Sequence, residues 1–162
     1  MKECLIISKL QIMIKELKSR THFQSIKLTK SYSKFGELIE ELRTRKLSQN
    51  TIDQINEELD LINIDSDEKT LKKLVFKKQY KVLQIVEKEH KLVPKNHYRN
   101  KWMVLGMTIF GLPFGVIFGS ALSNMAFLGI GLPIGMPIGM AIGAKKDMDA
   151  AKQGLQLNFS IG

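Results

Sequence analysis

Side chains that could do chemistry are few and scattered in this sequence. His22, His90 and His97 lie in different segments, and none has a second histidine, a cysteine or a carboxylate at metal-ligand spacing. Glu87 and Glu89 are close to His90 in sequence, but we expect these three residues to lie on a solvated helix face and not to form a functional site. The pattern therefore indicates no metal centre.

Nucleophilic catalysis and phosphate binding also lack their motifs. The chain has neither a phosphate-cradling loop ending in Gly-Lys-Ser/Thr nor a Gly-x-Ser-x-Gly elbow. The single cysteine, Cys4, lies beside Glu3 in an apolar stretch, which does not favour a thiolate. A lone cysteine cannot form an intramolecular disulfide, which fits a reducing compartment. We therefore expect no enzyme and no cofactor.

The net charge of +9 is arranged in blocks. Residues 1–36 carry +6, residues 37–68 carry −7 and residues 69–101 carry +9. The acidic block can neutralise the basic ones if the helices that carry them pack together. Nucleic acid is the competing partner, but no binding motif or aromatic stacking pattern accompanies the charge. We expect no nucleic-acid partner.

Residues 1–93 are predicted to form a cytoplasmic region of about four helices, because their apolar residues recur at helical spacing without strand alternation. The predicted helices cover about 4–19, 33–46, 51–61 and 67–92. The first is an amphipathic helix and not a signal peptide, since Lys9 interrupts its apolar stretch. Thr51 and Gln54 match a capping box at the start of the third. The fold class is therefore all-α.

A hinge follows this region at residues 94–98. Pro94 cannot continue a helix normally and disfavours helical geometry at Val93. The helical region and the apolar part of the chain should therefore be separate domains.

The chain then runs from Trp102 to Ala144, 43 residues, without a charged side chain, and nine of its twelve glycines lie in this run. At about 1.5 Å per residue the run corresponds to roughly 64 Å of helix, about twice the ~30 Å hydrocarbon thickness of a bilayer. The run therefore predicts a membrane protein that crosses the bilayer twice.

An internal repeat divides the run into two spans. Residues 110–119 and 130–139 share the pattern G-L-P-(F/I)-G-x-x-(F/I)-G at an offset of 20 residues. We predict spans at about 99–120 and 126–144, within a transmembrane hairpin of residues 99–146. A short cytoplasmic tail, residues 147–162, follows.

Basic residues flank both ends of the hairpin, whereas its turn, Ser120 to Asn124, has none. The residues expected at the membrane interface are Lys95, Arg99, Lys101, Trp102, Lys145 and Lys146. The positive-inside rule then predicts a multi-pass protein of the inner membrane with both termini in the cytoplasm. Its first partner is the lipid bilayer.

Glycines recur every four residues in both spans, and the two series are Gly111, Gly115, Gly119 and Gly131, Gly135, Gly139, Gly143. Four residues turn a helix through about 400°, so each series drifts by only about 40° per step and leaves a narrow groove. Such grooves let helix backbones approach closely. The two grooves could pair within one hairpin, or one could serve a contact between chains. We expect a homo-oligomer.

Three prolines, Pro113, Pro133 and Pro137, should kink the spans, because proline has no N–H to donate to the carbonyl four residues earlier. The freed carbonyls need partners in a bilayer, either neighbouring helices and water or ions on a path through the membrane. The run has no ionisable side chain, which argues against a proton relay.

The series Gly111-x-x-x-Gly115-x-x-x-Gly119 and the series from Gly131 resemble the glycine-zipper motif of diverse membrane proteins, channels and pore-forming toxins among them. With Tyr-Arg-Asn-x-Trp before the first span and G-I-G-L-P-I-G-M in the second, residues 98–154 are similar to small uncharacterised two-helix glycine-zipper proteins of bacteria. The resemblance implies close helix packing and adds no catalytic residue.

Two functions follow from these patterns. In the first, the hairpin self-associates as a pore or membrane-permeability effector. In the second, the hairpin only anchors residues 1–93, which bind an unknown protein partner as an adaptor or toxin inhibitor would.

Overall fold

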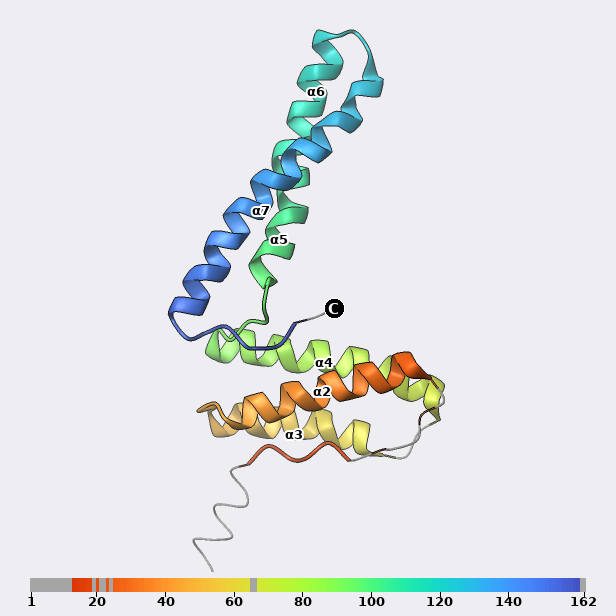
Figure 1. The fold of residues 1–162 in the computed structure, drawn as a ribbon, viewed down its shortest axis with the longest axis vertical. Helices are drawn as coiled ribbons and strands as arrows, with labels where there is room; N and C mark the ends of the chain where they lie inside the picture. The colour runs from red at the N-terminus through yellow and green to blue at the C-terminus, as the bar shows by residue number, and fades with distance from the viewer. Residues whose placement is uncertain (1–12, 19, 21–22, 24, 65–66, 161–162) are drawn as a thin grey trace, which may run out of the picture. The chain divides into compact units, whose positions relative to one another are not determined.

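The chain divides into two compact units, of which the first contains residues up to Leu92 with Leu157–Phe159, and the second contains Val93–Gln156. The computed structural model describes residues 13–18, 20, 23, 25–64 and 67–160, and its helices are labelled α2 to α7 in Figure 1. Helices make up most of the described residues of both units, and these residues contain no β-strand, only an isolated bridge between Val93 and Gln156. The all-helical prediction is confirmed for this part of the chain.

The described part of the first unit contains three helices: α2 (Ile26–Arg43), α3 (Gln49–Asn63) and α4 (Glu68–His90). Both α2 and α3 pack against α4. The core consists of side chains spaced three or four residues apart on each helix, mainly Leu28, Phe35, Leu38, Ile39, Leu42, Ile55, Leu59, Ile62, Leu71, Val75, Val82 and Val86. This spacing places them on one face of each helix, which the predicted periodicity anticipated.

The starts of α3 and α4 are set by side-chain caps. The Ser48 side chain accepts a hydrogen bond from the Thr51 N–H, and the Asp67 side chain accepts one from the Thr70 N–H. The predicted capping box at Thr51 is therefore wrong by three residues, because Ser48 lies in extended geometry just before the helix and Thr51 is fully buried inside it.

Opposite charges link the helices of this unit. The Lys78 ammonium lies 2.5 Å from the Glu58 carboxylate, which ties α4 to α3. Because both side chains are largely covered, this pair is less screened by solvent than an exposed one. It supports the expectation that the acidic block neutralises the basic blocks by packing.

The first predicted helix, 4–19, is wrong where it can be compared. Residues 1–12 lie outside the described part, and residues 13–18 form an extended segment between α2 and α3. We call residues 13–18 the extended segment. It buries Ile14, and Leu17 is partly covered, so its apolar residues still face inward although the backbone is not helical.

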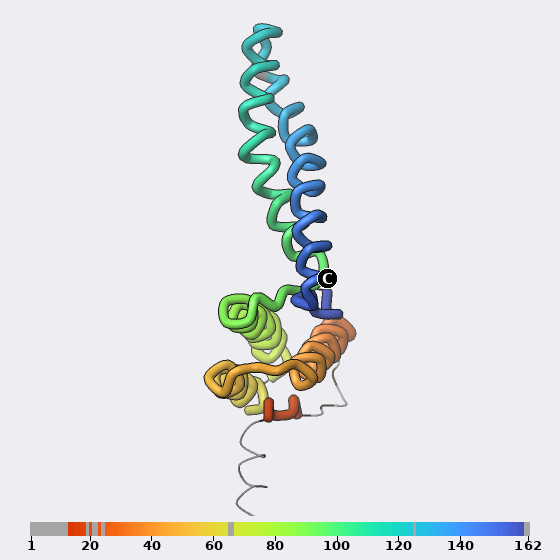
Figure 2. The backbone as a smooth tube through the Cα atoms, turned by 90° about the vertical axis from the view of Figure 1, so that its left-hand side faces the viewer, coloured from red at the N-terminus to blue at the C-terminus, as the bar shows by residue number. Residues whose placement is uncertain are grey.

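The second unit is a hairpin of two antiparallel helices (Figure 2). The first helix runs continuously through α5 (His97–Gly106), the π-helical turn η1 (Met107–Gly111) and α6 (Leu112–Ala121). After a turn and the short 3-10 helix η2 (Met125–Phe127), α7 (Leu128–Lys152) returns. Both helices are long and apolar enough to span a membrane.

The base of the hairpin is closed by main-chain bonds. The Val93 N–H donates to the Leu155 carbonyl at 3.0 Å, which joins the chain entering the hairpin to the chain leaving it. In the predicted hinge, Asn96 adopts a left-handed φ of 60° just before α5 begins. The second helix continues past the predicted end of the hairpin, so the first part of the predicted tail, residues 147–152, is helical.

Candidate functional site

The two glycine series face each other inside the hairpin. The buried glycines, which we call the glycine seam, are Gly106, Gly111, Gly115, Gly119, Gly131, Gly135, Gly139 and Gly143. A Cβ atom added to Gly106 would lie 2.5 Å from the Gly135 carbonyl oxygen, and one added to Gly111 would lie 2.9 Å from the Gly131 oxygen. Only glycine permits this approach of two backbones.

The π-helical turn keeps the first helix in register with the seam. Gly106 and Gly111 are five residues apart, which would place them about 140° apart around an α-helix. The turn over Met107–Gly111 adds one residue per turn, so both glycines face α7. Gly106 does not stand out in the sequence, because its spacing departs from the four-residue series.

Large apolar side chains point away from the seam. Within residues 104–118, Ile109 is 53% exposed, Val116 51% and Ile117 59%. In the most apolar stretch of each helix only 22% of the residues are buried. A hairpin with glycine inside and bulky apolar side chains outside is inverted relative to a soluble protein.

Basic side chains gather at the open end of this hairpin. The antiparallel arrangement brings the start of α5 next to the end of α7, since Gly143 lies against Arg99. The residues expected at the membrane interface therefore lie at one end; Lys95, Arg99, Lys101, Lys145 and Lys146 are exposed, and Trp102 is partly covered. The Lys146 ammonium lies 5.4 Å from the centre of the Trp102 ring, a cation–π distance.

Asp147, which was not among the predicted site residues, closes the same end. Its carboxylate is only 7% exposed and accepts hydrogen bonds from the N–H groups of Tyr98 (3.0 Å) and Arg99 (2.9 Å). These groups belong to the first turn of α5, whose own cap residue, Asn96, makes no side-chain cap bond. A residue from α7 thus caps α5. Asp147 follows Gly143 by four residues, so the four-residue spacing of the glycines places it on the same face of α7.

The three predicted kink residues lie on the outside of the hairpin. Pro113, Pro133 and Pro137 are all exposed, and the last two lie within α7. Gly129 is also exposed, and a Cβ atom there would meet nothing. Gly129, Pro133, Pro137 and Ala141 therefore form a four-residue series on the outer face of α7, which we call the outer stripe.

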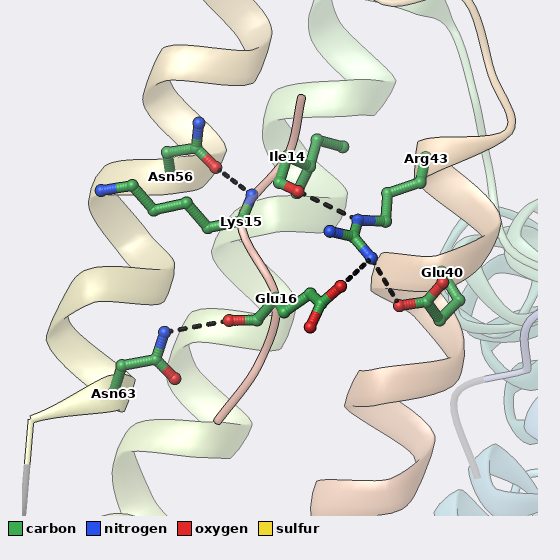
Figure 3. Close-up of polar contacts among 7 residues, drawn as sticks. All are labelled: Ile14, Lys15, Glu16, Glu40, Arg43, Asn56 and Asn63. Carbon is green, nitrogen blue, oxygen red and sulfur yellow. Dashed lines mark hydrogen bonds and ion pairs between the residues drawn. The ribbon is translucent and has the colours of Figure 1, made fainter. Parts of the chain in front are cut away.

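A second candidate site lies in the first unit, in the groove between α2 and α3 that holds the extended segment (Figure 3). On the α3 side, Asn56 accepts from the Lys15 N–H at 2.7 Å and donates to the Met13 carbonyl at 3.4 Å. Asn63 repeats this pattern, accepting from the Lys18 N–H at 2.8 Å and donating to the Glu16 carbonyl at 3.1 Å. Each asparagine side-chain amide thus accepts from one N–H and donates to one carbonyl of the segment, as the peptide groups of a neighbouring strand would.

Helix α2 bonds the segment from the other side. The Arg43 Nε donates to the Ile14 carbonyl at 2.9 Å, and the Tyr32 hydroxyl donates to the Lys18 carbonyl at 2.7 Å. Burial raises the pKa of Tyr32, an effect that the nearby Arg20 guanidinium opposes. Tyr32 therefore remains a neutral donor at physiological pH.

His90, expected on a solvated face, is instead half-buried against the start of α3. Its Nε2 lies 3.3 Å from the Ser48 nitrogen and 3.0 Å from the Thr51 hydroxyl. Since the Ser48 N–H can only donate, Nε2 acts as the acceptor in that bond. Within the described residues, no three histidine, cysteine or acidic side chains converge on a metal position.

No protein-family model, curated protein or solved structure matches the chain.

Proposed function

We propose that this protein is a membrane-anchored binding module. The hairpin of α5 to α7 crosses the inner membrane twice, with both termini in the cytoplasm, and holds the helical first unit at the membrane surface. There the first unit binds a protein partner, as an adaptor or an inhibitor does.

The observation that carries the membrane proposal is the inverted hairpin. Exposed apolar side chains cover its outside, and the glycine seam forms its inside. Lipid solvates such a surface, whereas water does not. The basic end with Trp102 fits the interface of an anionic leaflet, where each cation contributes about 1 kcal/mol.

The seam also favours an anchor over a pore. The two glycine series pack against each other within one chain, so neither leaves a groove into which a second copy could pack. The asparagine-lined groove of the first unit supplies the binding function that an anchored module requires.

A matched pair of lysine substitutions tests the anchor. Ile109 and Met148 are similarly exposed, 53% and 57%, but only Ile109 would lie among the lipid chains, at the middle of the first span. Lysine at the centre of a span costs about 2.5–3.5 kcal/mol, and outside the bilayer it costs little. After alkaline carbonate extraction of membranes, the wild type and Met148→Lys should stay in the pellet, and Ile109→Lys should be depleted from it. Equal behaviour of the two variants would reject the anchor.

A second candidate is self-association, which the outer stripe favours. Gly129, Pro133, Pro137 and Ala141 present a shallow surface, and Pro133 and Pro137 leave the carbonyls of Gly129 and Pro133 without a helical donor. A second copy packed there would form the predicted homo-oligomer and, with a central opening, a pore. Loss of membrane potential on expression would support the pore, and an intact potential would count against an open one.

A further inference from the structure

The groove between α2 and α3 recognises the extended segment mainly through its main chain. Four helix side chains bond six of its main-chain atoms. These are the carbonyl oxygens of Met13, Ile14, Glu16 and Lys18 and the nitrogens of Lys15 and Lys18, bonded by Asn56, Arg43, Asn63 and Tyr32. Main-chain atoms are common to all peptides, so this recognition is not restricted to one sequence.

The spacing of the two asparagines matches the repeat of an extended chain. Asn56 and Asn63 are seven residues apart on α3, which corresponds to about 10.5 Å along a helix. Their ligands are offset by three residues, and three extended residues span about 10 Å. The groove therefore keeps register with any extended peptide over this length.

Side chains of the segment add a modest preference. Ile14 is 3% exposed, so its side chain is buried while the segment is bound. The Lys15 ammonium lies 2.7 Å from Asp60, and the Glu16 carboxylate lies 3.2 Å from the Arg43 guanidinium. Both pairs are partly solvated and contribute little affinity. The preferred ligand thus has an apolar residue followed by a basic and an acidic one.

We propose that this groove is the partner-binding site of the module. Its ligand is an extended segment of another protein with the order apolar, basic, acidic, and residues 13–18 occupy the groove in its absence. This proposal depends on the binding-module function proposed above. The tethered segment competes at an effective concentration of about millimolar, so it weakens the apparent affinity for a free peptide.

Peptide binding to the full chain in detergent micelles tests the proposal. The probe is a fluorescein-labelled peptide with the sequence of residues 13–18, followed by fluorescence anisotropy. In the chain, Ile14→Asp should expel the tethered segment, because it places a carboxylate in an apolar site. The probe should then bind at least tenfold more tightly than it binds the wild type.

Adding Asn56→Ala and Asn63→Ala to this chain should lower the affinity at least tenfold. The control is Asn50→Ala, an exposed asparagine on the same helix, which should have no effect. A probe N-methylated at Lys15 and Lys18 keeps every side chain but loses both donors, and it should also bind at least tenfold more weakly. Equal binding of the methylated and plain probes would overturn the proposal.

A second variant tests the proposal even if Ile14→Asp prevents the chain from folding. A protease site inserted between Arg20 and Ser25 leaves the wild-type segment in place until it is cut. After cleavage, excess probe should replace the released fragment. Failure of the probe to enter the groove of the cut, still helical chain would overturn the proposal.

Two further outcomes are distinguishable. A dimer that Ile14→Asp dissociates would show that a second copy's segment fills the groove, which would contradict the assignment to another protein. Failure of membrane insertion would reject the anchor without affecting probe binding, because binding is measured in micelles. Failure of probe binding would likewise leave the carbonate extraction result intact.

Discussion

The carboxylate of Asp147 lies 2.9 Å from the main-chain nitrogen of Arg99, 48 residues earlier in the chain. This bond joins the end of one hairpin helix to the start of the other, at the basic end that we propose to lie at the membrane interface. Replacing Asp147 by alanine would leave two N–H groups of α5 without their partner.

We predict that Asp147→Ala destabilises the hairpin by about 0.5–2 kcal/mol, the range observed for loss of a helix cap. Thermal unfolding followed by circular dichroism in micelles measures the effect. Asp149→Ala is the matched control, because Asp149 is exposed on the same helix. Identical unfolding of both variants would show that the cap contributes nothing.

Leucine at the glycine seam should separate the hairpin helices. In Gly135→Leu the new side chain would meet the Gly106 carbonyl and the Gly111 backbone, and overpacking of this kind costs about 1–3 kcal/mol. A disulfide between cysteines introduced across the seam reports the distance between the helices. It should form more slowly in Gly135→Leu and normally in Gly129→Leu, since Gly129 faces open space.

The same two variants separate packing within the chain from self-association. If a second copy binds the outer stripe, Gly129→Leu should reduce crosslinked oligomers while the hairpin disulfide still forms. Oligomers that persist in Gly129→Leu and disappear in Gly135→Leu would instead assign self-association to the seam.

Amide hydrogen exchange should measure how strongly the asparagine hydrogen bonds protect the extended segment. Each bond is worth about 1 kcal/mol, so Asn63→Ala should speed exchange of the Lys18 amide several-fold and leave α4 protected. Mass spectrometry or NMR measures the exchange. Unchanged protection of Lys18 would contradict the bond.

Acid should loosen the start of α4. Hydrogen bonds from Thr70, its side chain and its N–H, lower the pKa of Asp67 from its ordinary value of 3.8. A lowered pKa means that the stabilisation is present above pH 3.8 and is lost as the pH falls through the folded-state value. Helicity measured between pH 6 and about pH 2 should decline less in Asp67→Asn, which caps without titrating, than in the wild type.

Much of the hairpin could be predicted from sequence, because a charge-free run and a four-residue glycine repeat allow few other structures. The predicted spans lie within the two observed hairpin helices, the π-helical turn included, except at residues 126–127, which belong to the 3-10 helix η2. Gly106 and Asp147 were missed for opposite reasons. Gly106 reaches the seam only through a π-helical turn, whereas Asp147 continues the four-residue spacing with a residue that is not glycine.

The groove could not be predicted from the sequence, because it is formed by contacts between residues that are far apart in the chain. Ile14 and Leu17 are three residues apart, a spacing that also suits a helix. The segment stays extended because its main-chain groups find partners on α2 and α3, more than ten residues away in sequence. The periodicity of apolar residues in one segment does not indicate which distant side chains will bond its main chain.

Cysteine labelling in intact cells that express the protein tests the proposed membrane hairpin most directly. In a Cys4→Ser background, Ser123→Cys places a thiol in the turn and Gln153→Cys places one just after α7. A membrane-impermeant maleimide should label Ser123→Cys in intact cells, and Gln153→Cys only after the cells are opened. Labelling of Gln153→Cys in intact cells, or protection of both thiols until lysis, would contradict a hairpin that crosses the membrane twice with its ends in the cytoplasm.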